Sequence, residues 1–96
     1  MKKEVESSSV DTIIALDVLE HVKEDKAAIA ESFRVLKPGG WCIFTIPQKD
    51  HLKVTEEDKS VTDPKERERL YGQWDHLRIY GTDFKARLEN AGYKVT

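Results

Sequence analysis

The chain has 96 residues, of which 39% are hydrophobic and 35% charged, with a formal net charge of −2. This length allows one domain, and the composition is that of a globular chain rather than a disordered one. No apolar stretch approaches the roughly 20 residues of a membrane span, and charges of both signs are interspersed, which gives no sign of nucleic-acid binding. The single cysteine, Cys42, cannot form an internal disulfide, so we expect a reducing, cytoplasmic environment.

Two short apolar runs frame the first half of the chain. Thr12–Leu16 and Trp41–Ile46 are typical of strands, and the first indicates a strand buried on both faces of a parallel sheet. Residues 25–36 between them have helical spacing, with Asp25 as the expected N-cap and an end forced by Pro38. Strand, helix, strand in this order predicts a parallel βαβ unit. The apolar stripe of the helix is expected to face the sheet and consists of Val22, Ile29, Phe33 and Leu36.

The second half begins with a charged insertion over residues 48–80, and Met1–Ser9 is expected to be a flexible N-terminus. Within the insertion we predict a helix over 64–71, because Asp63 suits an N-cap and Pro64 suits the first helical position. Glu66 would complete a capping box.

A last helix is predicted over residues 82–91. Gly81 or Thr82 would cap it, Phe84, Leu88 and Ala91 would form its apolar stripe, and Gly92 would end it. Residues 93–95 would then begin a third strand.

A polar cluster directly follows the first predicted strand and consists of Asp17, Glu20 and His21. Ligands of parallel sheets bind beyond the carboxyl ends of the strands, so these side chains lie where a site is expected. A histidine beside a carboxylate could act as a general base. Alternatively, Glu20 or His21 could brace the neighbouring loop.

A second candidate lies near the end of the charged insertion. His76 and Arg78 could contact a substrate, or they could tether the insertion to the edge of the sheet by hydrogen bonds. Trp74 and Tyr80 are expected to be hydrophobic anchors of this segment.

We expect no metal site from local spacing. The three histidines are His21, His51 and His76, and none of them has an i, i+4 partner or a C-x-x-C companion of the kind that zinc sites use.

Three segments in order carry a family resemblance: DVLEHV at 17–22, RVLKPGG at 34–40, and LYGQWDHLRIYGTDFKARLENAGYKV at 70–95. Together they resemble the C-terminal half of class I S-adenosylmethionine-dependent methyltransferases of the type 11-like group. The resemblance implies that Asp17, Val18 and Leu19 border the cofactor. It places Glu20, His21, His76 and Arg78 on the substrate side, with His21 and His76 as the candidate catalytic residues.

The family's glycine-rich loop, which holds the methionine part of the cofactor, has no counterpart here. The five glycines stand at 39, 40, 72, 81 and 92, and none forms a G-x-G cluster. We therefore expect an α/β, truncated Rossmann-like half-domain over residues 1–96, with a small and mainly parallel sheet. The isolated chain is expected to bind S-adenosylmethionine weakly and to be inactive.

Three functional alternatives stay open at this stage. The chain could be completed by a partner that supplies the missing N-terminal half, it could be a non-catalytic interaction module, or it could be a folded remnant without activity. Because the strand at Thr12–Leu16 would have no neighbour on one side, we expect self-association or partner binding through its edge.

Overall fold

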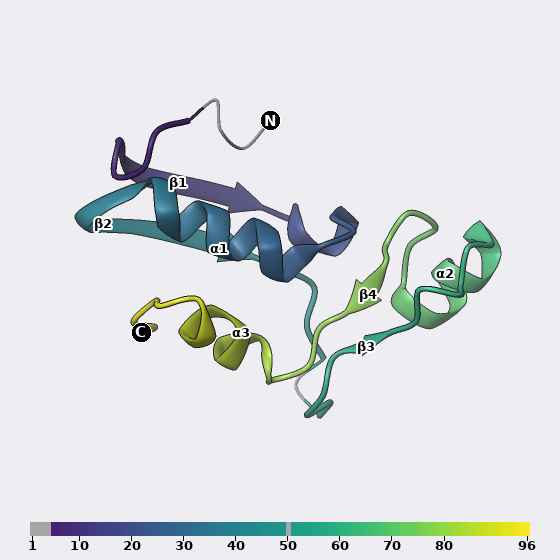
Figure 1. Cartoon of the computed structure of the whole chain (residues 1–96). Helices are drawn as coiled ribbons and strands as arrows, with labels where there is room; N and C mark the ends of the chain where they lie inside the picture. The colour runs from purple at the N-terminus through teal and green to yellow at the C-terminus, as the bar shows by residue number, and fades with distance from the viewer. Residues whose placement is uncertain (1–4, 50) are drawn as a thin grey trace.

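The computed structural model describes residues 5–49 and 51–96 and has the element order β1, η2, α1, β2, β3, α2, β4, α3. Strands β1 (Val10–Leu16) and β2 (Leu36–Thr45) pair in parallel, connected by helix α1 (Asp25–Val35). The parallel βαβ unit predicted from the sequence is therefore confirmed. Figure 1 shows α1 and the last helix, α3 (Phe84–Asn90), on the same side of the two strands.

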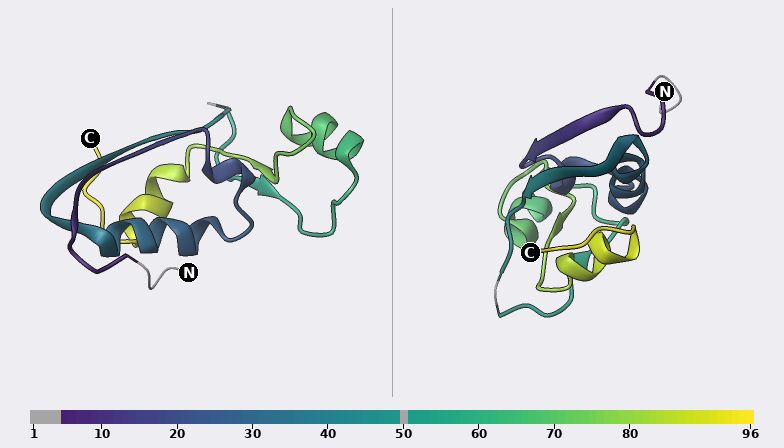
Figure 2. Two further views of the ribbon diagram at one scale, coloured as in Figure 1. Left: turned by 90° about the horizontal axis from the view of Figure 1, so that it is seen from above. Right: turned by 90° about the vertical axis from the view of Figure 1, so that its left-hand side faces the viewer.

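The charged insertion forms a lobe beyond the carboxyl end of β1 (Figures 1 and 2). Its helix α2 (Pro64–Tyr71) has the predicted bounds, and Asp63 caps it by accepting a 3.3 Å hydrogen bond from the Lys65 amide. Glu66 pairs with Arg69 at 2.7 Å on the same helix. Two short strands, β3 (Glu56–Glu57) and β4 (Arg78–Ile79), pair antiparallel and were not predicted.

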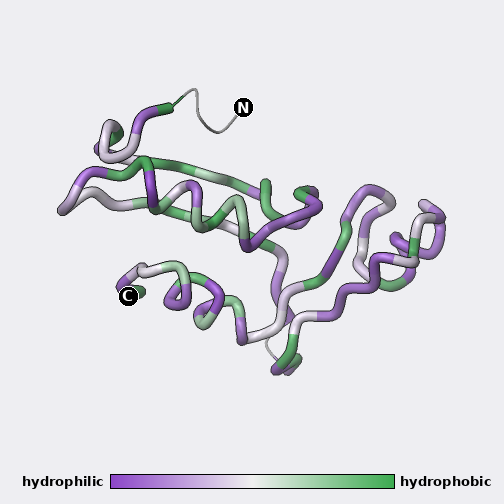
Figure 3. The backbone as a smooth tube through the Cα atoms, viewed as in Figure 1, coloured by the Kyte–Doolittle hydropathy of each residue, from purple (hydrophilic) through white to green (hydrophobic). Residues whose placement is uncertain are grey.

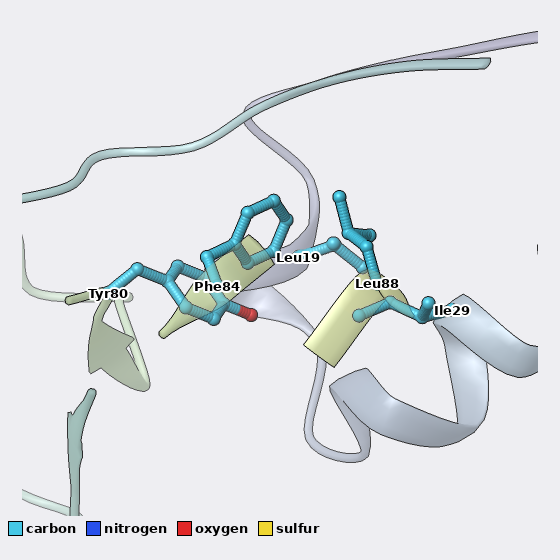
Figure 4. Close-up of a cluster of buried hydrophobic side chains, with 5 residues drawn as sticks. All are labelled: Leu19, Ile29, Tyr80, Phe84 and Leu88. Carbon is cyan, nitrogen blue, oxygen red and sulfur yellow. The ribbon is translucent and has the colours of Figure 1, made fainter. Parts of the chain in front are cut away.

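The main core lies between α1, α3 and the start of the segment that follows β1. Its buried members are shown in Figure 4: Leu19, Ile29, Tyr80, Phe84 and Leu88. Phe44 and Ile46 pack against this cluster from β2. Of the predicted stripe, Ile29 is buried on α1, whereas Phe33 is 43% exposed and stacks edge-on against Tyr93. Val22 and Leu36 lie outside the helix, since Val22 follows η2 (Leu19–His21) and the buried Leu36 begins β2.

The first strand was predicted to be buried on both faces of the sheet, and this prediction is wrong. Helices cover the two strands on one face only. Side chains alternate along both strands, so that Ile13, Ala15, Cys42 and Phe44 are half-buried on the helical side. The opposite side, which we call the open sheet face, exposes Ile14 (62%), Leu16 (58%), Trp41 (54%) and Ile43 (46%). In the described residues β1 has β2 as its one strand partner. Figure 3 shows the apolar character along β1 against the hydrophilic α2 lobe.

Strand β2 begins earlier than predicted, at Leu36. Val10 pairs with Leu36 and Thr12 with Trp41, so residues 37–40 bulge opposite Asp11. Gly39 has φ +84°, a conformation that favours glycine, and a Cβ at Gly40 would lie 2.9 Å from the Asp11 carbonyl oxygen. The glycine pair thus forms a bulge inside the strand rather than a turn before it.

Three further predictions about local structure are wrong. Glu24, not Asp25, is the N-cap of α1, because the Asp25 carboxylate is buried and bonded to distant residues. Asp83, not Gly81 or Thr82, is the N-cap of α3. The third strand at 93–95 is not formed, because the Tyr93 amide donates to Leu88 O at 3.2 Å and ties the chain to the end of α3. Gly92 follows α3 with φ +114°, as predicted for the residue that ends the helix.

Part of the N-terminal prediction lies outside the described residues, which exclude 1–4. From Val5 onward the segment follows the end of α1, where the Ser8 and Ser9 amides donate to the carbonyls of Arg34 and Val35 at 3.0 and 2.9 Å. Residues 5–9 are therefore held at the end of α1 and do not cover the free edge of β1. No described helix has the length and apolar character that a membrane span requires.

Candidate functional site

The candidate site starts where β1 ends. Asp17 has φ +54°, and its amide donates to Thr45 O at 2.9 Å and to Thr45 Oγ1 at 3.0 Å. These bonds hold the carboxyl ends of β1 and β2 together and turn the chain away from the sheet. Asp17 and Val18 are exposed beyond the strand ends, in the position predicted for a ligand site.

A single 3₁₀ turn, η2 (Leu19–His21), then divides three neighbouring side chains between different environments. Leu19 enters the core and is 4% exposed, and Glu20 is 1% exposed. The His21 side chain reaches the surface and is 34% exposed. The buried Leu19 therefore fixes the turn that places Glu20 and His21.

The segment before β4 brings His76 to the same place. The Leu77 amide donates to Glu20 O at 2.8 Å, which joins this segment to η2. The rings of His21 and His76 then meet edge-to-face, with centroids 4.8 Å apart. Glu20 Oε2 lies 3.7 Å from His21 Nε2 and 4.0 Å from His76 Nε2. The structure therefore joins three of the predicted site residues into one cluster.

Arg78 lies beside this cluster and faces inward. Its Nη1 donates to Leu19 O and Val22 O, both at 2.7 Å, and its Nη2 donates to Lys23 O at 3.1 Å. The residue is 2% exposed. Arg78 therefore tethers the charged lobe by hydrogen bonds, but to η2 and the loop after it rather than to the edge of the sheet, as the tethering alternative had it.

A charge network continues from Arg78 and reaches from the interior to the surface. Its buried members are Asp25, Arg78 and Tyr80, Arg87 is half-buried, and Glu57 lies at the surface. Arg78 Nε donates to Glu57 Oε1 at 2.8 Å, and Arg87 bonds both Glu57 at 2.7 Å and Asp25 at 2.6 Å. Tyr80 Oη donates to Asp25 Oδ2 at 2.6 Å.

Burial raises the pKa of Asp25, but the hydrogen bond from the Tyr80 hydroxyl and the guanidiniums of Arg78 and Arg87 outweigh it and leave that pKa below its ordinary value. Burial likewise raises the pKa of Glu57, and the same two guanidiniums outweigh it and lower that pKa. Burial and the hydrogen bond to Asp25 raise the pKa of Tyr80.

The charge network has no signal in the local sequence, and the prediction for Trp74 is wrong. Asp25, Glu57 and Arg87 are far apart in the sequence, and no local spacing marks them as partners. Trp74, predicted to be a hydrophobic anchor, is 58% exposed, whereas Tyr71 in the same lobe is buried. Tyr80 is 0% exposed, which confirms the prediction that it is a hydrophobic anchor.

A large open groove lies away from these residues. It has a volume of about 950 Å³ and runs between the bulge of β2 and the C-terminal tail. Phe33, Phe44 and Tyr93 contribute to its wall, whereas Asp17, Glu20 and His21 do not. The groove therefore does not coincide with the polar cluster at the strand ends.

Comparison with known proteins identifies the family of this chain. The chain matches the family model of a methyltransferase domain over residues 1–96, and it belongs to that family. It is also 36% identical over 58 residues to an uncharacterized 37.1 kDa protein in transposon TN4556 of Streptomyces fradiae. That match covers 60% of this chain and 17% of the relative, so the chain spans only a small part of the relative's length. No solved structure matches this chain.

Proposed function

We propose that this chain is the substrate-side half of an S-adenosylmethionine-dependent methyltransferase unit and is inactive by itself. The observation that supports the proposal best is the position of Asp17 and Val18. Both are exposed beyond the carboxyl ends of a parallel strand pair, where ligands of such sheets bind. Because the chain belongs to a methyltransferase domain family, we expect the cleft for methyl transfer at this position.

The residues at the strand ends fit one border of a cofactor site. Asp17 and Val18 are exposed, whereas the Leu19 side chain is buried, so Leu19 offers only its backbone. When bound, S-adenosylmethionine would supply the methyl group from its sulfonium. None of the five glycines forms a G-x-G cluster that would cradle the methionine part. The residues of this chain therefore fit the edge of the site and not its floor.

The contribution of this chain to methyl transfer would be positioning. Glu20 and His76 are buried, and the partly exposed His21 is the member of the cluster that a methyl acceptor can reach. Transfer to a good nucleophile gains mostly from a correct approach of the two reactants. An acid–base role for His21 or His76 stays a prediction.

We further propose that the missing glycine-rich part is contributed by another segment, of a longer chain or of a partner, and that it docks on the open sheet face. Four large apolar side chains on adjacent strands are exposed there, and Ile14 pairs directly with Ile43. Exposed apolar groups gathered in this way mark interaction surfaces. The free edge of β1 offers backbone groups to the same partner. We also propose that the protein is located in the cytoplasm.

The test is titration of the chain with S-adenosylmethionine, followed by calorimetry and by amide NMR shifts. We expect binding weaker than about 1 mM, because the cradle is missing, with shifts confined to residues 17–19 and their neighbours. Binding in the low micromolar range would contradict the half-site proposal. Shifts that avoid the strand ends altogether would contradict the position of the cleft.

The open sheet face also favours a second candidate, a non-catalytic interaction module. The two proposals differ in what the strand ends do. An interaction module would associate through the open sheet face and show no cofactor-dependent shift at Asp17, even after its partner has bound.

A further inference from the structure

Glu20, His21 and His76 come together with the donor atoms that a metal ion requires. A candidate ligand atom from each of the three side chains lies within 4.8 Å of the other two. The carboxylate comes from η2, and the second imidazole comes from a segment 55 residues further along the chain. This assembly is why local sequence spacing gave no sign of a metal site.

Both imidazoles are oriented by backbone carbonyls. His21 Nδ1 lies 3.3 Å from Asp75 O, and His76 Nδ1 lies 3.3 Å from Tyr71 O. A carbonyl oxygen can only accept, so each Nδ1 carries the proton in these contacts. The lone pair is then left on Nε2, the atom of each ring that faces Glu20. Metal-binding histidines are held by their second nitrogen in this way.

Glu20 supplies an independent observation. The residue is 1% exposed, and its Oε1 atom is buried without a hydrogen-bond partner among the described residues. Its Oε2 atom lies 3.7 and 4.0 Å from the two Nε2 atoms, which is longer than a hydrogen bond. A buried carboxylate with so few partners is costly, and a cation between the three groups would compensate it.

We propose that Glu20, His21 and His76 form a binding site for a divalent transition-metal ion. Two imidazoles and a carboxylate suit Zn²⁺, Fe²⁺, Mn²⁺ or Co²⁺ rather than Ca²⁺ or Mg²⁺. In a tetrahedral zinc site the ligand atoms are roughly 3.3 Å apart, so the three groups close slightly on binding. The half-exposed His21 makes that closure possible.

Three protein ligands leave at least one coordination position open. That position faces solvent on the His21 side, since Glu20 and His76 are buried. An oxygen donor, either water or a ligand at the strand ends, would complete the coordination. A metal on Nε2 also excludes His21 as a general base. The proposal concerns metal binding and does not depend on methyl transfer.

The test uses the full chain, freed of metal by chelation, and titrates it with Zn²⁺ by calorimetry and with Co²⁺ by visible absorption. We expect one equivalent bound with a dissociation constant of about 1 μM or tighter, and d–d absorption bands of a low-symmetry Co²⁺ site. Absence of stoichiometric binding at about 100 μM metal would overturn the proposal.

Substitutions locate the site. Glu20→Gln and His76→Gln should each weaken Zn²⁺ binding by at least about 10- to 100-fold, the loss that changes of supporting residues alone produce. Glu24→Gln and His51→Gln are the matched controls, since both residues are exposed and lie outside the cluster, and they should leave the affinity unchanged. Equal losses in His51→Gln and His76→Gln would contradict the assignment.

A measurement on the unsubstituted chain covers the case in which a variant does not fold. Imidazole ¹⁵N resonances report directly on each ring nitrogen. Equimolar Zn²⁺ should shift the Nε2 signals of His21 and His76 and leave those of His51 in place. Shifts at His51 alone, or at Nδ1 instead of Nε2, would refute the proposed coordination.

Discussion

Tyr80 donates a 2.6 Å hydrogen bond through its hydroxyl to Oδ2 of Asp25, a residue 55 positions earlier in the chain. Arg87 donates to the same oxygen at 2.6 Å. Asp25 is the first residue of α1, Tyr80 follows β4, and Arg87 lies in α3. One carboxylate thus joins the βαβ unit, the charged lobe and the last helix.

Replacing Asp25 with alanine should lower the free energy of unfolding by about 3–5 kcal/mol, because the buried Tyr80 hydroxyl loses its acceptor and Arg87 loses one of its two carboxylate partners. Chemical denaturation of the two proteins measures the difference. Glu24→Gln is the matched control, because among residues 5–49 and 51–96 the ion pair of that exposed carboxylate is with the surface residue Lys59, and the change should cost less than about 1 kcal/mol. Similar losses in both variants would show that the network does not stabilise the fold.

The same network makes acid stability predictable. Asp25 and Glu57 both have pKa values below their ordinary values of 3.8 and 4.5. Their stabilisation is therefore complete above those ordinary values and is lost as the pH falls through the lower folded-state values. Urea denaturation should give a free energy of unfolding that drops steeply below about pH 4.5. The slope should be shallower in Asp25→Asn, and a slope unchanged in that variant would contradict the assignment.

The open sheet face predicts association. Sedimentation velocity should show concentration-dependent self-association of the chain, and Ile14→Lys combined with Ile43→Lys should reduce it by adding charge to the contact. Both side chains are already exposed, so the fold should survive the change. Val54→Lys is the control, since that valine is 68% exposed in a different part of the molecule. A chain that stays monomeric at all concentrations would contradict self-association and leave a partner segment as the occupant.

Truncation of two aromatic residues of the charged lobe should lower the free energy of unfolding by very different amounts. Tyr80→Ala removes a ring that is 0% exposed and packs against Phe84 at 4.8 Å, so a loss of about 3–5 kcal/mol is expected. Trp74→Ala removes a larger side chain that is 58% exposed, and the loss should stay within about 0.5 kcal/mol. Thermal or urea denaturation of the two variants decides, and a loss for Trp74→Ala as large as that for Tyr80→Ala would show that Trp74 is an anchor after all.

The local sequence was a reliable guide wherever the cause of a structure is local. Asp63 and Pro64 start α2 because a capping carboxylate and a fixed φ act within one turn, and the helix begins where they predict. The apolar runs at Thr12–Leu16 and Trp41–Ile46 likewise predict two strands, and the helix between them requires a parallel pairing. The position of the polar cluster at the strand ends follows from that pairing.

The tertiary structure alone decided which distant groups meet. Asp25 has the right type and place for an N-cap, yet Tyr80 and Arg87 draw its carboxylate into the interior. Trp74 and Tyr80 look equally suited to burial, and only packing separates them. The local sequence gives no sign that His21 and His76 belong to one cluster. They meet because the Leu77 amide donates to the carbonyl of Glu20 and joins the two segments. Hydrogen bonds and ion pairs across 55 residues depend on chain topology, and no periodicity along the sequence encodes them.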